Sequence, residues 1–389
     1  MTKRRIAILG STGSIGRQAL DIVSRHPDLF QVVALSAHSQ AETLFEQVRR
    51  FRPRIAALTS GERPLPEDVR GCQWYFGAES LARIASQADY DDVLVSVVGM
   101  VGLSGVLAAR KAGRRVLLAN KEALVAGGQL VMDLCPPGYM DPALIPVDSE
   151  HSAIYQCLMA AAGNPYERII LTASGGPFRE YTMAQMRKVK PQDALKHPNW
   201  NMGAKITVDS ASMFNKALEI IEARWLFHAL PGQIEVLVHP QSIVHSLVAF
   251  RDGAVLAQLG LPDMRAPIAF AMAYPERIDS GTAPLRLDRL GTLHFEAPDV
   301  ARFPALRLAM EALLNGGAAC CILNAANEMA VEAFLSERIR FTDIAGIVED
   351  TLGRLGRLPA DSLDAVLEAD RMARAEANRL IVKRTLEEA

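Results

Sequence analysis

The feature that most constrains the fold is a regular alternation of short β-branched runs with amphipathic stretches over residues 5 to 120. The apolar runs have the length of buried strands, and the stretches between them have helical periodicity. This alternation is typical of a parallel sheet with crossover helices, so we expect a Rossmann-like, doubly wound α/β domain. The expected strands are Ile6–Leu9, Gln31–Leu35, Ile55–Leu58, Val93–Val98 and Arg115–Ala119, and the expected helices are Ser14–Arg25, Ala41–Arg50, Ala78–Gln87 and Leu103–Ala112.

The rest of the chain divides into two further regions. Pro136-Pro137-Gly138 interrupts the pattern, and from about Pro304 the sequence has almost continuous helical periodicity, which predicts a C-terminal helical bundle. We predict a dinucleotide-binding domain over residues 1–145, an α+β catalytic domain over 146–285 and a helical domain over 286–389. The strands expected between the first and last regions are Leu144–Val147, Arg168–Thr172, Ile234–Val238, Ile243–Phe250 and Ala254–Leu259, with a hairpin turn at Asp252-Gly253.

Composition excludes several classes of protein. Half of the residues are hydrophobic and 22% are charged, which argues against extended disorder. The 42 Lys and Arg residues nearly balance the 44 Asp and Glu residues, so nothing draws the whole surface toward nucleic acid or an anionic membrane. There is no run of about 20 apolar residues, and no signal-peptide-like apolar region follows the basic N-terminus. We expect a cytoplasmic protein whose anion sites are local.

A glycine-rich turn, Gly10-Ser11-Thr12-Gly13-Ser14-Ile15-Gly16, lies between the first expected strand and helix. Glycines there allow backbone N–H groups to approach a pyrophosphate at the positive helix N-terminus. The G-x-x-G-x-x-G spacing differs from the usual G-x-G-x-x-G, so a turn needed only for packing is the alternative. After the second expected strand, His38-Ser39-Gln40 contains no carboxylate to repel a 2′-phosphate and no Lys or Arg to bind one. The absence of a carboxylate favours NADP, with an ordinary exposed histidine as the alternative for His38.

Two acidic segments suggest a metal site. Asp148 and Glu150 follow an apolar run and would project to the same side if strand geometry continued, and clustered oxygen ligands suit Mg²⁺ or Mn²⁺. An acidic cap at a helix N-terminus is the alternative. Asn215, Lys216 and Glu219 share a helical face that is suited to a phosphate and a metal, with a solvated Lys–Glu pair as the alternative.

Other segments supply further candidates for a site. Asp209 or Ser210 is expected to cap a helix over roughly Ala211–Leu226. Lys121 lies at the end of the fifth expected strand, where ligands of doubly wound domains bind. A long polar segment ends at His197–Gly203 and contains Trp200, which suggests a lid over the substrate, although a core anchor is the alternative for this tryptophan. For His239 and His245, structural roles are favoured.

Taken in order, these segments closely resemble those of 1-deoxy-D-xylulose 5-phosphate reductoisomerases. The resemblance runs over nearly the whole chain, and the segments Val147–His151 and His197–Gly203 are specific to that family. It implies an oxidoreductase of isoprenoid precursor synthesis that uses NADPH and a divalent metal, Mg²⁺ or Mn²⁺. Its substrate, 1-deoxy-D-xylulose 5-phosphate, is rearranged and reduced to 2-C-methyl-D-erythritol 4-phosphate. We also expect a homodimer that pairs through the antiparallel strands.

The resemblance also implies roles for individual residues. Asp148, Glu150 and Glu219 would bind the metal and, with Lys121, form the catalytic group, while Ser149 would contact the substrate's oxygenated carbons. Trp200 and Met202 would belong to the closing loop. The phosphate end of the substrate would be held by Ser174, His197, Ser210, Asn215 and Lys216. The cofactor site would be lined by Thr12, Gly13, Ser14, Ile15, Asn120, Glu122 and Gly203, together with His38, Ser39 and Gln40, where many family members have a basic residue instead.

Two other functions remain open at the level of sequence. A semialdehyde reductase on the same cofactor domain needs a nucleophilic cysteine, and none of the five cysteines has a convincing setting for that role. That enzyme would also leave the acidic cluster unexplained. A dinucleotide-sensing scaffold without activity is the second alternative, and cofactor binding without turnover would favour it.

Overall fold

The computed structural model describes residues 3–86, 89–138, 140–196, 200 and 202–388. The chain folds as two compact units. Unit 1 contains Met1–Ala123, Val131–Ser152 and Asp263–Ala283, and unit 2 contains Leu124–Leu130, Ala153–Pro262 and Pro284–Ala389. Among the described helices, none combines the length and the hydropathy of a membrane span. The boundaries of the three predicted domains stay a prediction.

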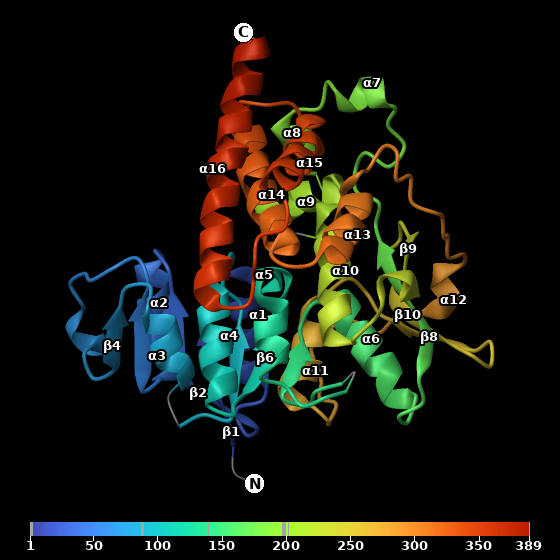
Figure 1. The fold of residues 1–389 in the computed structure, drawn as a ribbon. Coiled ribbons are helices and arrows are strands. Elements are labelled where there is room, and N and C mark those ends of the chain that lie inside the picture. Colours follow the sequence, from blue (N-terminus) through green and yellow to red (C-terminus); the bar gives the residue numbers. More distant parts are fainter. Residues whose placement is uncertain (1–2, 87–88, 139, 197–199, 201, 389) are drawn as a thin grey trace. The chain divides into compact units, whose positions relative to one another are not determined.

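Unit 1 is built on a seven-stranded sheet with the order β4-β3-β2-β1-β5-β6-β7. Figure 1 labels β4, β2, β1 and β6 of this sheet. All neighbouring strands are parallel, which confirms the predicted doubly wound class. Because β1 has β2 on one side and β5 on the other, the direction of winding changes there, and ligands bind at such switch points. The strands are β1 (Arg4–Leu9), β2 (Phe30–Ala37), β3 (Ile55–Leu58), β4 (Gln73–Phe76), β5 (Asp92–Val95), β6 (Arg115–Leu118) and β7 (Leu144–Pro146).

Most helices of unit 1 come directly after a strand of the same sheet in the chain. Helix α1 is amphipathic and buries Ala19, Leu20, Ile22 and Val23. The helices are α1 (Ser14–Arg25), α2 (Ala41–Phe51), the 3₁₀ turn η1 (Glu67–Val69), α3 (Ser80–Ser86), α4 (Val101–Lys111) and α11 (Arg265–Ala273).

The strands of unit 1 differ from the sequence prediction at two places. Strand β5 ends at Val95 instead of Val98, and the short edge strand β4 was not predicted.

Two helices contribute residues to both units. Helix α5 (Lys121–Met132) was not predicted, because its adjacent glycines have poor helix propensity; its backbone is non-helical at Gly127. Helix α6 (Ser149–Ala160) follows β7 almost directly. Since the helix starts at Ser149, the strand geometry expected through Glu150 does not continue, and that part of the sequence prediction is wrong.

Unit 2 contains a four-stranded sheet with the order β11-β10-β8-β9. Strand β10 is antiparallel to both of its neighbours, whereas β8 and β9 are parallel. The β10–β11 hairpin turns at Gly253, where φ is +86°, as the Asp-Gly pair predicts. The predicted use of these strands in a homodimer stays a prediction. The strands are β8 (Tyr166–Ala173), β9 (Ile234–Val238), β10 (Val244–Phe250) and β11 (Val255–Leu259).

The C-terminal part of unit 2 is helical, as predicted, and α14, α15 and α16 pack against one another (Figure 1). The helices break at Gly316-Gly317 and between Leu355 and Leu363. The long polar segment contains two single-turn helices. The helices of the unit are α7 (Met183–Met186), α8 (Pro191–Ala194), α9 (Ala204–Ala211), α10 (Phe214–Leu226), the 3₁₀ turn η2 (Pro231–Gln233), α12 (Leu287–Leu290), α13 (Ala305–Asn315), α14 (Ala319–Leu335), α15 (Asp343–Leu355) and α16 (Leu363–Glu388).

Candidate functional site

The glycine-rich turn brings backbone N–H groups to the switch point of unit 1. Gly10 has a φ of +88°, and a Cβ atom on it would lie only 2.8 Å from the carbonyl oxygen of Ser96, so a side chain is excluded there. Gly13 is the N-cap of α1 and provides no side-chain cap. The first N–H groups of α1 therefore lack intrahelical partners and are available to an anion. Thr12 is buried in this turn, Ser14 is exposed, and Ile15 is half-buried.

The residues that follow β2 have polar side chains, and none of them is Lys or Arg. His38, Ser39 and Gln40 are all exposed. The Nδ1 atom of His38 lies 2.8 Å from the hydroxyl of Thr59, which follows β3. Sequence reasoning missed Thr59, although its position directly after the strand adjacent to β2 was a usable signal. The structure thus adds a hydroxyl to the set of neutral donors at this edge of the sheet.

Asp148 immediately precedes α6 and is ionised by its surroundings. Its carboxylate forms an ion pair with Lys121, the first residue of α5, and lies 3.1 Å from Nδ1 of the buried His151. Burial by itself would raise the pKa of Asp148, but the Lys121 ammonium and His151 outweigh burial and hold this pKa well below its usual range. The backbone N–H groups of Glu150 and His151 also donate to Asp148, so the acidic-cap alternative describes part of its role.

Glu219 is fully buried on α10 and is bonded to two residues of its own helix. Lys216, which is 3% exposed, forms an ion pair with it, and Nδ2 of Asn215 donates to its Oε1 atom at 2.7 Å. The spacing correctly predicted that the three side chains share a face. The solvated Lys–Glu pair considered as the alternative is wrong, because neither member of the pair is exposed to water.

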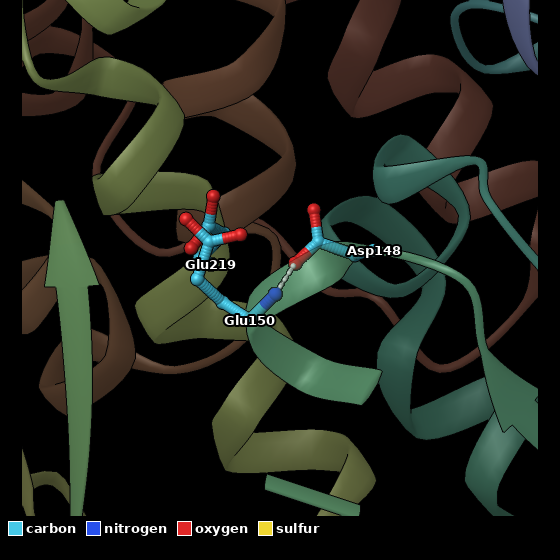
Figure 2. A group of neighbouring side chains, drawn as sticks. All are labelled: Asp148, Glu150 and Glu219. Carbon is cyan, nitrogen blue, oxygen red and sulfur yellow. Dashed lines mark hydrogen bonds between the residues drawn. The ribbon is translucent and has the colours of Figure 1, made fainter. Parts of the chain in front are cut away.

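The three carboxylates of Asp148, Glu150 and Glu219 form a group that suits a divalent cation. Each offers one oxygen, and the three oxygens lie within 4.8 Å of one another; Figure 2 shows the side chains. Glu150 lies in the first turn of α6, and its carboxylate accepts a hydrogen bond from the hydroxyl of Ser149. Hard oxygen ligands in this number fit Mg²⁺ or Mn²⁺.

The two serines expected at the phosphate end of the substrate each lie beside Gly176, within unit 2. Ser174 follows β8, and its hydroxyl accepts the N–H of Gly176 at 3.2 Å. Ser210 is in α9, and a Cβ on Gly176, whose φ is +67°, would lie 2.8 Å from the Ser210 carbonyl oxygen. The prediction that Asp209 or Ser210 caps the next helix is wrong, because α10 begins at Phe214 and both residues belong to α9. Asp209 instead accepts hydrogen bonds from Lys205 and Asn327, each at 2.8 Å.

The structure describes Trp200, Met202 and Gly203 of the predicted closing loop. His197 lies outside the described residues. Trp200 is half-buried with its ring centroid 6.2 Å from that of His245, while Met202 is half-buried and Gly203, the N-cap of α9, is exposed. The roles predicted for these residues stay predictions.

His239 and the cysteines have structural settings. His239 is fully buried, and both ring nitrogens are bonded, one to the His294 carbonyl and one to the Ile243 N–H, which agrees with the structural role favoured for it. Burial raises the pKa of all five thiols. For Cys157 the pKa rises to about 11, so this thiol is protonated at neutral pH and a poor nucleophile. The semialdehyde-reductase alternative loses its required nucleophile.

A doubly wound sheet with an anion-binding turn at its switch point, together with three clustered carboxylates, defines an oxidoreductase that combines a dinucleotide with a metal. Comparison with known proteins identifies the family. The family model for 1-deoxy-D-xylulose 5-phosphate reductoisomerase matches residues 6–128, and models for the C-terminal domains of the same enzyme match residues 144–227 and 259–376. The chain belongs to the 1-deoxy-D-xylulose 5-phosphate reductoisomerase family.

Relatives and solved structures agree with this assignment. The 1-deoxy-D-xylulose 5-phosphate reductoisomerase of Ralstonia nicotianae is 52% identical over 98% of this chain and 99% of its own length. That of Cupriavidus necator is 53% identical over 96% and 97%. The Zymomonas mobilis enzyme, solved with NADPH, has a TM-score of 0.88 at 41% identity, covering 98% of this chain and 99% of that one. A reductoisomerase solved with NADPH, fosmidomycin and magnesium has a TM-score of 0.88 at 42% identity, covering 97% and 98%.

Proposed function

We propose that this chain converts 1-deoxy-D-xylulose 5-phosphate to 2-C-methyl-D-erythritol 4-phosphate with NADPH and a divalent metal, a step of isoprenoid precursor synthesis. The observation that carries the proposal is the group of three carboxylates in a chain that also has a glycine-rich turn at the switch point of its parallel sheet. Membership of the reductoisomerase family supports it. Solved relatives bind NADPH, magnesium and fosmidomycin, which are the kinds of ligand the proposal requires here.

Asp148, Glu150 and Glu219 would hold the metal. When bound, a metal at these carboxylates supplies Lewis acidity toward the adjacent carbonyl and hydroxyl oxygens of a ketose. Lys121 forms an ion pair with Asp148, and its ammonium would donate a hydrogen bond to a substrate oxygen. Ser149, at the start of α6, would contact the same oxygenated carbons.

The phosphate end of the substrate would be bound by residues of unit 2. Lys216 and Asn215 would supply an ammonium and an amide from α10, and Ser174, after β8, and Ser210, in α9, would supply hydroxyls. Such a set of donors binds a phosphate through charge-assisted hydrogen bonds. Trp200 and Met202 would close over the bound substrate and exclude water, which retains the fragments of a rearrangement until NADPH supplies the hydride.

NADPH would bind at the switch point of unit 1, with its pyrophosphate on the turn that contains Thr12, Gly13, Ser14 and Ile15. Glu122 and Gly203 would also line the cofactor site. His38, Ser39 and Gln40 would face the 2′-phosphate with neutral donors. We also propose that the protein is a homodimer and that it is located in the cytoplasm.

An NADPH-oxidation assay tests the proposal directly. We expect oxidation that requires both 1-deoxy-D-xylulose 5-phosphate and Mg²⁺ or Mn²⁺, and that stops when EDTA removes the metal, because the carboxylate group then has no cation to present to the substrate. The methylerythritol phosphate product would be identified by mass spectrometry. NADPH binding without turnover under these conditions would favour the sensing scaffold instead.

A second prediction concerns the 2′-phosphate. We expect His38→Ala to weaken NADPH binding about three- to tenfold and to leave NADH binding nearly unchanged, because one hydrogen bond to a phosphate is lost. Both cofactors would be titrated by fluorescence. His26→Ala is the control, because His26 is a half-buried histidine of unit 1 at the C-cap of α1, with its ring bonded to the Asp279 carbonyl. Equal losses for the two cofactors, or no loss, would assign 2′-phosphate recognition to other residues.

A further inference from the structure

Helix α9 is short, so its position depends on the contacts that it makes with the rest of unit 2. It has eight residues, Ala204 to Ala211, and its N-cap, Gly203, provides no side-chain hydrogen bond. A helix of about two turns is not stable by itself in water. Its buried residues Val208 and Ala211 hold it against the core, but apolar contacts are not directional. A directional contact is needed to fix the rotation of the helix about its axis.

Asp209 provides a directional contact between α9 and α14. Its side chain is 2% exposed, and one carboxylate oxygen accepts a hydrogen bond from Nδ2 of Asn327, on α14, at 2.8 Å. The other oxygen lies 2.8 Å from Nζ of Lys205, in the first turn of α9. Hydrogen bonds to an ionised group are the stronger kind. The carboxylate therefore joins α9 to the C-terminal helices by a bond of fixed geometry.

The amide of Asn327 is not explained by stability alone. Asn327 is 0% exposed, and its Oδ1 atom has no hydrogen-bond partner among the described residues. A buried carbonyl without a partner costs free energy of folding. Apolar residues in place of a buried polar pair are often as stable or more stable. The pair that Asn327 forms with Asp209 is thus better explained by what it positions.

Ser210 follows Asp209 directly, so the rotation of α9 also sets the position of the Ser210 hydroxyl. Successive residues of an α-helix are about 100° apart around its axis. With Asp209 bonded to α14, Ser210 has a fixed direction. The next residue, Ala211, packs against the turn that contains Ser174, because a Cβ on Gly176 would lie 2.9 Å from the Ala211 Cα. The bond to α14 therefore fixes the segment that carries one of the expected phosphate-binding serines.

We propose that Asp209 and Asn327 are positioning residues of the phosphate site, whose hydrogen bond sets the rotation of α9 so that the Ser210 hydroxyl meets the phosphate of the substrate. The inference rests on the proposed function and deepens it, because it makes the C-terminal helices part of substrate recognition. Neither residue needs to touch the substrate. A shift of about 1 Å in a group that orients the substrate is enough to impair an enzyme.

The first test compares Asn327→Leu with Asn324→Leu. Asn324 is the matched control, because it is also 0% exposed on α14, but its amide donates to Glu328 of the same helix. We expect Asn327→Leu to raise KM for 1-deoxy-D-xylulose 5-phosphate about tenfold and to weaken inhibition by inorganic phosphate by a similar factor. The dissociation constants of NADPH and Mn²⁺ should change less than about twofold. Asn324→Leu should leave all four quantities near those of the wild type.

A double-mutant cycle shows whether Asn327 acts through Ser210. Ser210→Ala should raise KM, and Asn327→Leu in that background should raise it less than about twofold further, because the hydroxyl that the bond positions is already absent. A structural defect that does not act through Ser210 would instead add its full effect.

Exchanging the two side chains gives a second test, which also holds if Asn327→Leu does not fold. Asn327→Asp alone places two buried carboxylates against each other and should raise KM. Asp209→Asn combined with Asn327→Asp again pairs an amide with a carboxylate, so KM should return to within about threefold of the wild type.

Four results would each overturn the inference: a wild-type KM in Asn327→Leu, additive effects in the cycle, equal losses of NADPH and Mn²⁺ affinity, or no recovery in the exchanged protein. A wild-type protein that does not turn over 1-deoxy-D-xylulose 5-phosphate would instead refute the proposed function.

Discussion

Glu219→Gln is expected to lose at least about 100-fold in turnover at ordinary Mg²⁺ concentrations, because it removes one of three anionic oxygen ligands from the proposed metal site. Glutamine preserves the shape of the side chain, and its carbonyl can still accept the hydrogen bond from Asn215. The backbone of α10 should therefore stay intact. The loss would arise from charge, since hard divalent cations depend on carboxylates for much of their affinity in water.

The same change also affects stability, and the two effects must be measured apart. Glu219 and Lys216 are 0% and 3% exposed, so glutamine leaves a buried ammonium without its counter-ion. Removing one partner of a buried pair costs about 3–5 kcal/mol, which predicts a lower free energy of unfolding. Glu222→Gln is the control, because Glu222 is also a buried carboxylate of α10 but lies outside the group of three.

Three measurements decide the role of Glu219: the free energy of unfolding, the dissociation constant for Mn²⁺, and turnover as a function of metal concentration. We expect Glu222→Gln to retain Mn²⁺ affinity and Glu219→Gln to lose it. If Glu219→Gln bound Mn²⁺ as tightly as the wild type, or turned over normally at the same Mg²⁺ concentration, Glu219 would not be a metal ligand.

The sequence predicted the arrangement on α10 because local periodicity determines it. Residues three and four apart share a helical face whatever the rest of the chain does, so the relation of Asn215 and Lys216 to Glu219 could be read directly. The start of this helix could not be predicted in this way, because it depends on contacts with residues far away in the sequence. Asp209 resembles an N-cap in sequence, yet its carboxylate is bonded to Lys205 and to Asn327 of α14, and α10 begins only at Phe214.

The acidic motif at residues 148–150 shows the same limit. Sequence reasoning placed both carboxylates on one side of a continuing strand, whereas the chain turns into α6 at Ser149 and Asp148 caps that helix. The structure brings both carboxylates together with Glu219, but the predicted backbone geometry is wrong, because a short apolar run does not show where a strand ends. On the cofactor side, the pattern predicted the glycine-rich turn between the first strand and helix, but the strand from Val93 was expected to continue through Val98, so the β5–α4 loop was not predicted.

The second large effect is expected for Lys216→Met, which removes the ammonium and keeps most of the side-chain volume. If Lys216 binds the phosphate of the substrate, KM should rise about tenfold to 100-fold, because a charge-assisted hydrogen bond contributes about 1.5–3 kcal/mol. Turnover should also fall, since binding energy from the phosphate helps to orient the reacting carbons. Inhibition by inorganic phosphate, measured alongside KM, should weaken by a similar factor. An unchanged KM would remove Lys216 from the phosphate site.

Metal affinity distinguishes Lys216→Met from Glu219→Gln, although both lower turnover. In the wild type the Lys216 ammonium occupies Oε2 of Glu219 and repels a cation nearby. Without it Glu219 keeps the hydrogen bond from Asn215 and loses its ion pair with Lys216, so Mn²⁺ should bind at least as tightly and should raise the melting temperature more than in the wild type. Glu219→Gln should show almost no metal-dependent rise. Weaker Mn²⁺ binding in Lys216→Met would mean that Lys216 holds Glu219 in place for the metal. Only the KM measurement would then support a contact between Lys216 and the phosphate.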